Sequence, residues 1–192
     1  MDIIPRVQAV LLKPKEEWVK IKAEPSTVAE LFTGYAMILA AIPAVFQFLG
    51  NIFVLRLPMG ARFPLGRALG SAIVSYIFAL VTVYLFALII NELAPNFGSA
   101  KNMTNALKLS VYSMTPGWVA GVLYIIPGLW IVGIMASLYG LYILYLGFDT
   151  PMMETPKDKV AGYMAVSVVV VIVLYVVFWI LGGIFAVRYA RI

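Results

Sequence analysis

The chain has 192 residues, of which 63% are hydrophobic and 12% are charged, and its mean hydropathy is +0.98. A water-soluble fold of this size cannot bury so much apolar surface, so the composition places the chain in a membrane. Cysteine and histidine are both absent, which excludes disulfides, thiol nucleophiles, imidazole bases and the usual zinc, copper and haem sites. The formal charge of +5 comes from basic residues scattered between apolar runs, which favours anionic lipid over nucleic acid as their partner.

Residues 1–28 predict a retained leader, because charged residues and prolines precede the first apolar run of spanning length. Apolar residues recur at helical spacing on both sides of Pro14, which predicts two short amphipathic helices with Pro14 in the first turn of the second. We expect the leader to lie in the lipid headgroup layer, with Trp18, Lys13 and Lys15 contacting lipid. The alternative is a leader that packs against its own protein.

The first predicted span runs from about residue 29 to 53, with Ser26 as its N-cap and Glu30 in its first turn. Small residues at fourfold spacing predict a seam for close helix packing, and a proline predicts a kink; these residues are Ala36, Ala40, Ala44 and Pro43.

Two prolines, two arginines and one glycine between Arg56 and Pro64 predict a loop before the second span, which lies at about 66–93. Ser71 and Ser75 repeat the small-residue spacing there.

The next two spans form a hairpin, with arms at about 108–126 and 129–147 and a tight break at Pro127-Gly128. An arm of about 19 residues spans about 28 Å, close to the thickness of bilayer hydrocarbon. Pro116 predicts a kink whose freed carbonyls the hydroxyls of Ser113 and Thr115 can satisfy. Small residues on both arms predict close packing: Gly117, Gly121, Gly133, Ser137 and Gly140.

A valine-rich fifth span follows at about 164–187, with a short tail at 188–192. Five spans place the termini on opposite sides of the membrane. Nine Lys and Arg residues flank the amino-terminal side and five flank the other, so the positive-inside rule predicts a cytoplasmic amino terminus and an external carboxy terminus.

A set of polar residues accompanies the spans: Gln47, Asn91, Glu92, Ser110, Ser113 and Thr115. They could line a polar path, or form interhelical hydrogen bonds of about 1 kcal/mol each, and the second interpretation is favoured. None of the carboxylates falls in the middle of a predicted span, where it would mark a transport path. Glu92 and Lys108 flank one loop and could pair, but solvated helix ends are the favoured interpretation, because exposed ion pairs contribute little. Tyr139, Tyr142 and Tyr145 form a stripe that favours packing and interface anchoring, with Tyr145 near the headgroups, over a ligand-lining role.

Several motifs occur in an order that covers almost the whole chain: Leu12-Lys13-Pro14 to Trp18, Ala40-Ala41-Ile42-Pro43, Tyr112 to Pro116, Ile126-Pro127, Tyr139-Gly140-Leu141-Tyr142, Tyr145-Leu146-Gly147 and Pro156-Lys157-Asp158-Lys159. This order resembles the Yip family (Ypt-interacting proteins), especially its bacterial and archaeal branch. The resemblance implies a five-span membrane protein; eukaryotic members associate with Rab-type GTPases and act in vesicle budding and organelle shape, and no catalytic residues come with it.

The sequence therefore predicts an all-α, five-span integral membrane protein, without cofactor or metal, in the inner membrane if the source is prokaryotic. No Walker, dinucleotide, GxSxG or HExxH motif occurs, so no enzymatic activity is expected. We expect a role in membrane organisation through helix packing and contacts with anionic lipid, a second copy or another membrane protein; a small GTPase partner follows from family analogy alone. The alternative is a small transporter or channel with a polar path along spans one to three.

Overall fold

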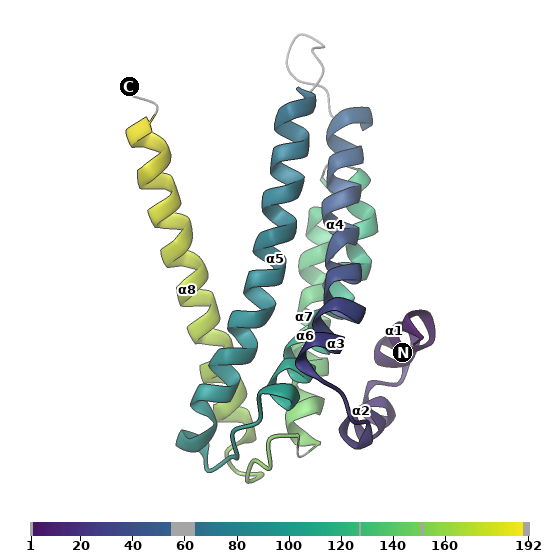
Figure 1. Cartoon of the computed structure of the whole chain (residues 1–192), viewed down its shortest axis with the longest axis vertical. Helices are drawn as coiled ribbons and strands as arrows, with labels where there is room; N and C mark the ends of the chain where they lie inside the picture. Colours follow the sequence, from purple (N-terminus) through teal and green to yellow (C-terminus); the bar gives the residue numbers. More distant parts are fainter. Residues whose placement is uncertain (1, 55–63, 127, 151, 190–192) are drawn as a thin grey trace.

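A computed structural model describes residues 2–54, 64–126, 128–150 and 152–189, apart from the side chains of residues 130, 174, 175 and 177–189. The described residues form helices and contain no strand (Figure 1). Two short helices, α1 (Ile3–Leu12) and α2 (Pro14–Ala23), make up the leader. Pro14 occupies the first turn of α2, as predicted, since a proline there loses no helical hydrogen bond.

In the part of the chain that the structure describes, five longer helical segments follow the leader and run along the long axis of the molecule (Figure 1). The first is continuous through α3 (Val28–Leu31), a π-helical turn (Phe32–Ala36), α4 (Met37–Leu49) and a second π-helical turn (Gly50–Val54). The others are α5 (Leu65–Leu93) with a 3-10 turn (Ala94–Phe97), α6 (Met103–Ala120) with a 3-10 turn (Gly121–Ile125), α7 (Trp130–Asp149) and α8 (Val160–Tyr189).

Within the described residues, three segments are long and apolar enough to cross a membrane: Val28–Val54, Leu65–Phe97 and Ile131–Asp149. Many large apolar side chains stay exposed along these segments, as lipid contact requires. The chain is thus an all-α membrane protein, as its composition predicts. The count of five spans stays a prediction.

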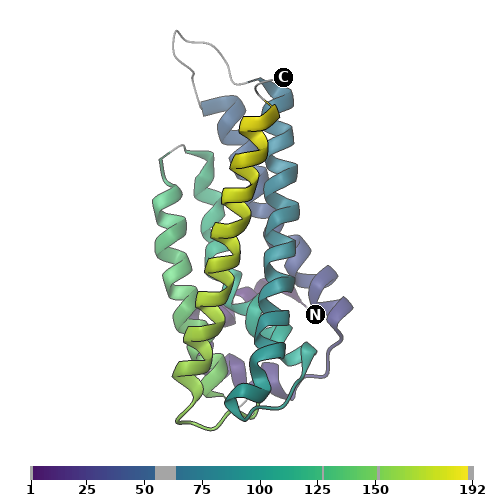
Figure 2. The same ribbon diagram turned by 90° about the vertical axis from the view of Figure 1, so that its left-hand side faces the viewer.

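Helix α6 lies at the centre and contacts α4, α5 and α7. Most of its side chains are buried, including Ser110, Ser113 and Thr115, so its polar residues face protein and not lipid. Helix α8 packs against α5 and α7 through its first turns and leans away from α5 toward its carboxyl end (Figures 1 and 2).

Two local predictions need correction. The N-cap of the first long segment is Thr27, and not Ser26, because the Thr27 hydroxyl accepts from the Glu30 amide at 3.2 Å while the Glu30 carboxylate accepts from the Thr27 amide at 2.8 Å. Beside Pro116, the Ser113 hydroxyl donates to the Ser110 carbonyl at 2.9 Å, so it does not bind the carbonyl of residue 112 that the proline frees.

Helix ends also differ from the predicted spans. Helix α6 begins at Met103 and not near Lys108, because its first turn is capped by Asn102 and covered by protein. Helix α8 begins at Val160, whose side chain is buried. The predicted loop at 56–63 and the break at Pro127 lie outside the described residues, as do residues 190–192 of the predicted tail.

Candidate functional site: the docked leader

The leader is folded against the bundle beside the amino-terminal end of α6 (Figure 1). Trp18 on α2 is 1% exposed, and its indole Nε1 donates to the Ile143 carbonyl of α7 at 2.9 Å. The ring lies against Gly147, where an added Cβ would be 2.7 Å from Trp18 Cζ2. Trp18 therefore packs in the protein interior, because a glycine on α7 leaves room for its ring. The predicted contact of Trp18 with lipid is wrong.

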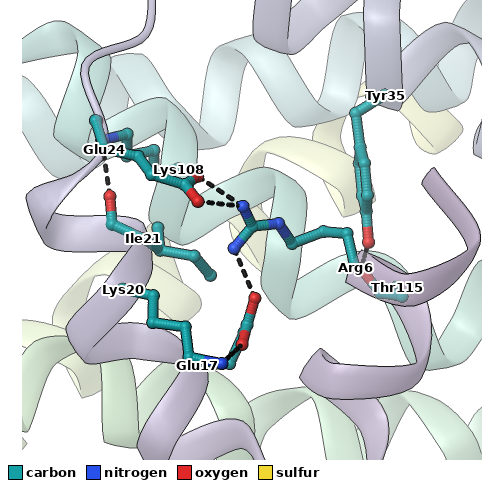
Figure 3. Close-up of polar contacts among 8 residues, drawn as sticks. All are labelled: Arg6, Glu17, Lys20, Ile21, Glu24, Tyr35, Lys108 and Thr115. Carbon is teal, nitrogen blue, oxygen red and sulfur yellow. Dashed lines mark hydrogen bonds and ion pairs between the residues drawn. The ribbon is translucent and has the colours of Figure 1, made fainter. Parts of the chain in front are cut away.

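A buried ion cluster joins α1 to α2. The Arg6 guanidinium donates to Glu17 through Nη1 and to both carboxylate oxygens of Glu24 through Nη2 (Figure 3). The Arg6 and Glu17 side chains are 9% and 6% exposed, whereas that of Glu24 is 47% exposed. Lys20 Nζ lies 3.3 Å from the other Glu17 oxygen. Burial lowers the pKa of Arg6, but the hydrogen bond to Glu24 and the charges of both carboxylates outweigh it and raise this pKa overall, so the cation is held firmly.

Lys108 ties this cluster to the bundle. Its Nζ donates to the carbonyls of Ile21 and Glu24, at 2.7 Å each (Figure 3). These carbonyls end α2 and have no partner within the helix, and a cation there also complements the helix dipole. Lys108 therefore does not pair with Glu92, whose partner is Lys101. We call Arg6, Glu17, Glu24 and Lys108 the leader clamp.

An aromatic group lies beside the leader clamp. The Tyr112 ring packs edge-on against Trp18 and Tyr35, with centroid distances of 6.0 and 4.9 Å, and Arg6 Cζ lies 6.0 Å from its centroid. The Tyr35 hydroxyl bonds the Thr115 hydroxyl at 2.9 Å, which accounts for that buried polar residue. Tyr112 of α6 therefore contacts the leader directly, and Tyr35 of the first long segment supports Tyr112 from the other helix.

A third contact comes from the predicted tyrosine stripe. The Tyr139 hydroxyl of α7 donates to the Leu11 carbonyl in the last turn of α1, at 2.8 Å. Tyr139 therefore anchors α1, while Tyr145 is 42% exposed and its contact with headgroups stays a prediction. Lys13 and Lys15 are exposed on the leader, and their contact with lipid also stays a prediction.

The outer face of the leader remains apolar in part. Ile4, Leu12 and Val19 are 70%, 79% and 62% exposed. The leader clamp and Trp18 thus bury one side of the leader against the bundle and leave an amphipathic side uncovered.

The predicted packing residues fall into two groups. Ala36, Ala40 and Ala44 are buried in the first long segment. Gly121 approaches Pro43 so closely that an added Cβ would lie 2.8 Å from its Cα, and added Cβ atoms at Gly133 and Gly140 would overlap Tyr124 and the Ser113 carbonyl. By contrast, Gly117 faces the Ser137 hydroxyl, at 3.1 Å from an added Cβ, and Ser71 is exposed with its hydroxyl bonded to the Ala68 carbonyl of its own helix.

The predicted polar set is not brought together as a single path. Ser110 donates to the Val83 carbonyl at 2.8 Å, and Asn91 donates to Glu92 at 3.1 Å near the end of α5. Gln47 and Ser113 lie elsewhere, on the wall of a cavity of about 520 Å³ between α4, α5, α6 and α7.

Sequence reasoning missed the leader clamp, although one signal was present. Arg6 interrupts the apolar series of Ile3, Val7 and Val10 and so falls on the buried face of α1. Within the described residues, no group of three or more His, Cys, Asp or Glu side chains could hold a metal ion. The leader clamp, Trp18 and Tyr139 together hold an amphipathic leader against the membrane bundle.

Comparison with known proteins agrees with the assignment of the chain as an all-α membrane protein. The Yip1 domain matches residues 9–180, so the chain belongs to the Yip1-domain family. The chain is 25% identical over 185 residues to the inner membrane protein YohC of Escherichia coli strain K12, and equally so to YohC of strain CFT073. In both cases the match covers 88% of this chain and 92% of the relative. No solved structure matches the chain.

Proposed function

We propose that this protein organises the membrane without catalysing a reaction, by holding its leader as an amphipathic wedge in one leaflet. The observation that carries the proposal is the two-sided leader: the leader clamp and Trp18 fix its inner side, and Ile4, Leu12 and Val19 remain exposed on its outer side. Apolar side chains flanked by lysines are the composition of helices that lie in the headgroup layer.

A docked leader acts on the bilayer more strongly than a free one, because its position relative to the spans is fixed. A free amphipathic helix can leave the interface, whereas this one is held at the bundle by bonds from α6 and α7. It widens the protein in one leaflet only, and a difference in area between the leaflets favours curvature. The Yip1-domain membership is consistent with such a role.

The proposal also covers the topology of the chain and the membrane in which it lies. We place five spans across the membrane, with α6 and α8 as the third and fifth, an internal amino terminus and an external carboxy terminus. The inner membrane is the proposed location, by analogy with the relatives' names. Exposed Lys13 and Lys15 would contact anionic headgroups, at about 1 kcal/mol each.

Proteoliposomes test the proposal. The full chain is reconstituted into vesicles of phosphatidylethanolamine and phosphatidylglycerol, and vesicle diameters are measured by electron cryomicroscopy at rising protein content. We expect diameters to fall with the wild type and to fall much less with Arg6→Met, which frees α1, the helix that carries Ile4 and Leu12, from α2. Lys101→Met is the matched control, because it removes one positive charge from an exposed pair. Equal diameters for the wild type and Arg6→Met would overturn the wedge.

Transport is the second candidate function, and the cavity that contains Gln47 and Ser113 is the observation that favours it. Solute or ion flux into the same vesicles, abolished by Gln47→Leu or Ser113→Val, would establish it over the organising role.

A further inference from the structure

The cavity between α4, α5, α6 and α7 has a volume of about 520 Å³, within the range of about 300–1,000 Å³ typical of small-molecule sites. Close contacts bound it, where Gly121 touches Pro43 and Gly140 touches the Ser113 carbonyl. Between these contacts, small side chains such as Ala40, Ala44 and Gly117 keep the helices from filling the space. The same small residues that allow close packing elsewhere therefore leave a void here.

The polar groups of this cavity come from four helices. Gln47, Ser75, Ser113 and Ser137 each contribute one, from α4, α5, α6 and α7 respectively, and Trp118 and Tyr124 also line the cavity. Gln47 Oε1 accepts from the Ser75 hydroxyl at 3.4 Å, and no described group accepts a hydrogen bond from the Gln47 NH₂. The Ser113 and Ser137 hydroxyls donate to their own helices, at 2.9 and 2.8 Å, so their oxygens keep the capacity to accept.

The rest of the cavity wall determines whether a charged or a neutral ligand fits. None of the described residues around the cavity is charged, and apolar side chains such as Trp118, Met114 and Leu144 make up much of its surface. A charged molecule would lose its hydration there without gaining a counter-charge. A neutral molecule with a hydroxyl head could accept from the Gln47 NH₂ and donate to a serine oxygen, with its apolar body against Trp118.

We propose that this cavity binds an uncharged amphipathic molecule with a hydroxyl head and an apolar body, drawn from the bilayer or from solution. The site is independent of the wedge, since the leader clamp does not line it. It also requires no flux, because a bound molecule of this kind can stay in place between the helices.

The test uses ω-bromoundecanol, whose bromine quenches tryptophan fluorescence on contact. The full-length chain is measured in detergent, in a background with Trp130→Phe and Trp179→Phe, which leaves Trp118 in the cavity wall and Trp18 in the leader contact. We expect saturable quenching that disappears with Trp118→Phe. The anionic ω-bromoundecanoate should give no saturable quenching.

Two variants address the site itself. Gln47→Leu removes the hydrogen-bonding amide and should weaken apparent affinity about fivefold, the effect of one lost hydrogen bond. Ser137→Leu places a larger side chain against Gly117 and should abolish saturation. Ser71→Leu is the matched control, because Ser71 is exposed on α5 and does not line the cavity.

Quenching that is linear in probe concentration and equal in all variants would overturn the site. The same measurement in proteoliposomes distinguishes the source. Binding of alcohol preloaded into the lipid, but not of alcohol added to the aqueous phase, would identify the bilayer, and the reverse result would identify the aqueous phase. Saturable binding of the carboxylate with equal affinity would refute the assignment of a neutral ligand.

Discussion

Removing Arg6 should loosen the leader, because the Arg6 pairs with Glu17 and Glu24 hold α1 on α2. In Arg6→Met the Glu17 carboxylate would stay behind, and its side chain is only 6% exposed. Breaking a buried ion pair by deleting one partner typically costs about 3–5 kcal/mol, because the other charge is left without compensation. We expect the lower end, about 3 kcal/mol, because Lys20 Nζ remains 3.3 Å from Glu17. Glu24 adds little, since its exposed side chain can be solvated.

Hydrogen–deuterium exchange in nanodiscs measures this effect. A loss of about 3 kcal/mol in local stability raises the exchange rate of protected amides in α1 and α2 by about a hundredfold, while amides of α5 keep their rates. Lys13→Met is the control, because its pair with Glu16 spans 4.0 Å and both side chains are 70% exposed. Combining Arg6→Met with Glu17→Leu should restore much of the protection, since a neutral apolar pair leaves no buried charge.

One result would refute this reasoning directly. If α1 and α2 amides exchanged no faster in Arg6→Met than in Lys13→Met, the buried cluster would not hold α1 on α2. If the double variant were less protected than Arg6→Met alone, the cost would come from lost packing and not from an unpaired carboxylate.

Three further predictions concern stability, measured by thermal or denaturant unfolding in detergent. Trp18→Ala should destabilise the protein by about 3–5 kcal/mol, because it empties a buried site against Gly147, and an equal effect from exposed Val19→Ala would contradict this. Gly121→Ala should destabilise the protein by about 1–3 kcal/mol, because the new methyl group meets the Pro43 backbone. Gly70→Ala should stabilise α5 by about 0.5–1 kcal/mol, because nothing lies within 4 Å of its added Cβ. A larger loss of stability in Gly70→Ala than in Gly121→Ala would show that the helices at Gly121 move apart freely. Thr27→Ala should cost about 1 kcal/mol by removing the capping box, and Ser26→Ala should cost less; the reverse would restore Ser26 as the cap.

The hydropathy of the sequence predicts a membrane protein and most of its helices. It does not tell whether an apolar residue faces lipid or the protein interior. Trp18 illustrates this, because lipid and a protein interior are both apolar and the same helical spacing fits either. Only the fold places Gly147 beside it. The capping box at Thr27 and Glu30 was a readable signal, in contrast, since the two residues are three apart as the motif requires.

The leader clamp depends on contacts that no local pattern contains. Arg6 meets Glu17 because α1 folds back on α2, and Lys108 reaches Ile21 from 87 positions away. Small-residue spacing likewise predicts close approach without naming the partner. Gly121 meets Pro43 of another helix, whereas Gly117, four residues earlier, faces a cavity.

The depth of the leader in the bilayer tests the central proposal most directly. The chain has no cysteine, so single nitroxide labels can be placed at Leu12→Cys and Glu16→Cys, both exposed on the leader. Electron paramagnetic resonance then compares the accessibility of each label to oxygen and to a water-soluble nickel chelate. We predict that the label at position 12 lies about 5–10 Å below the headgroup surface and the label at position 16 lies in water. Equal, water-like accessibility at both positions would contradict the wedge.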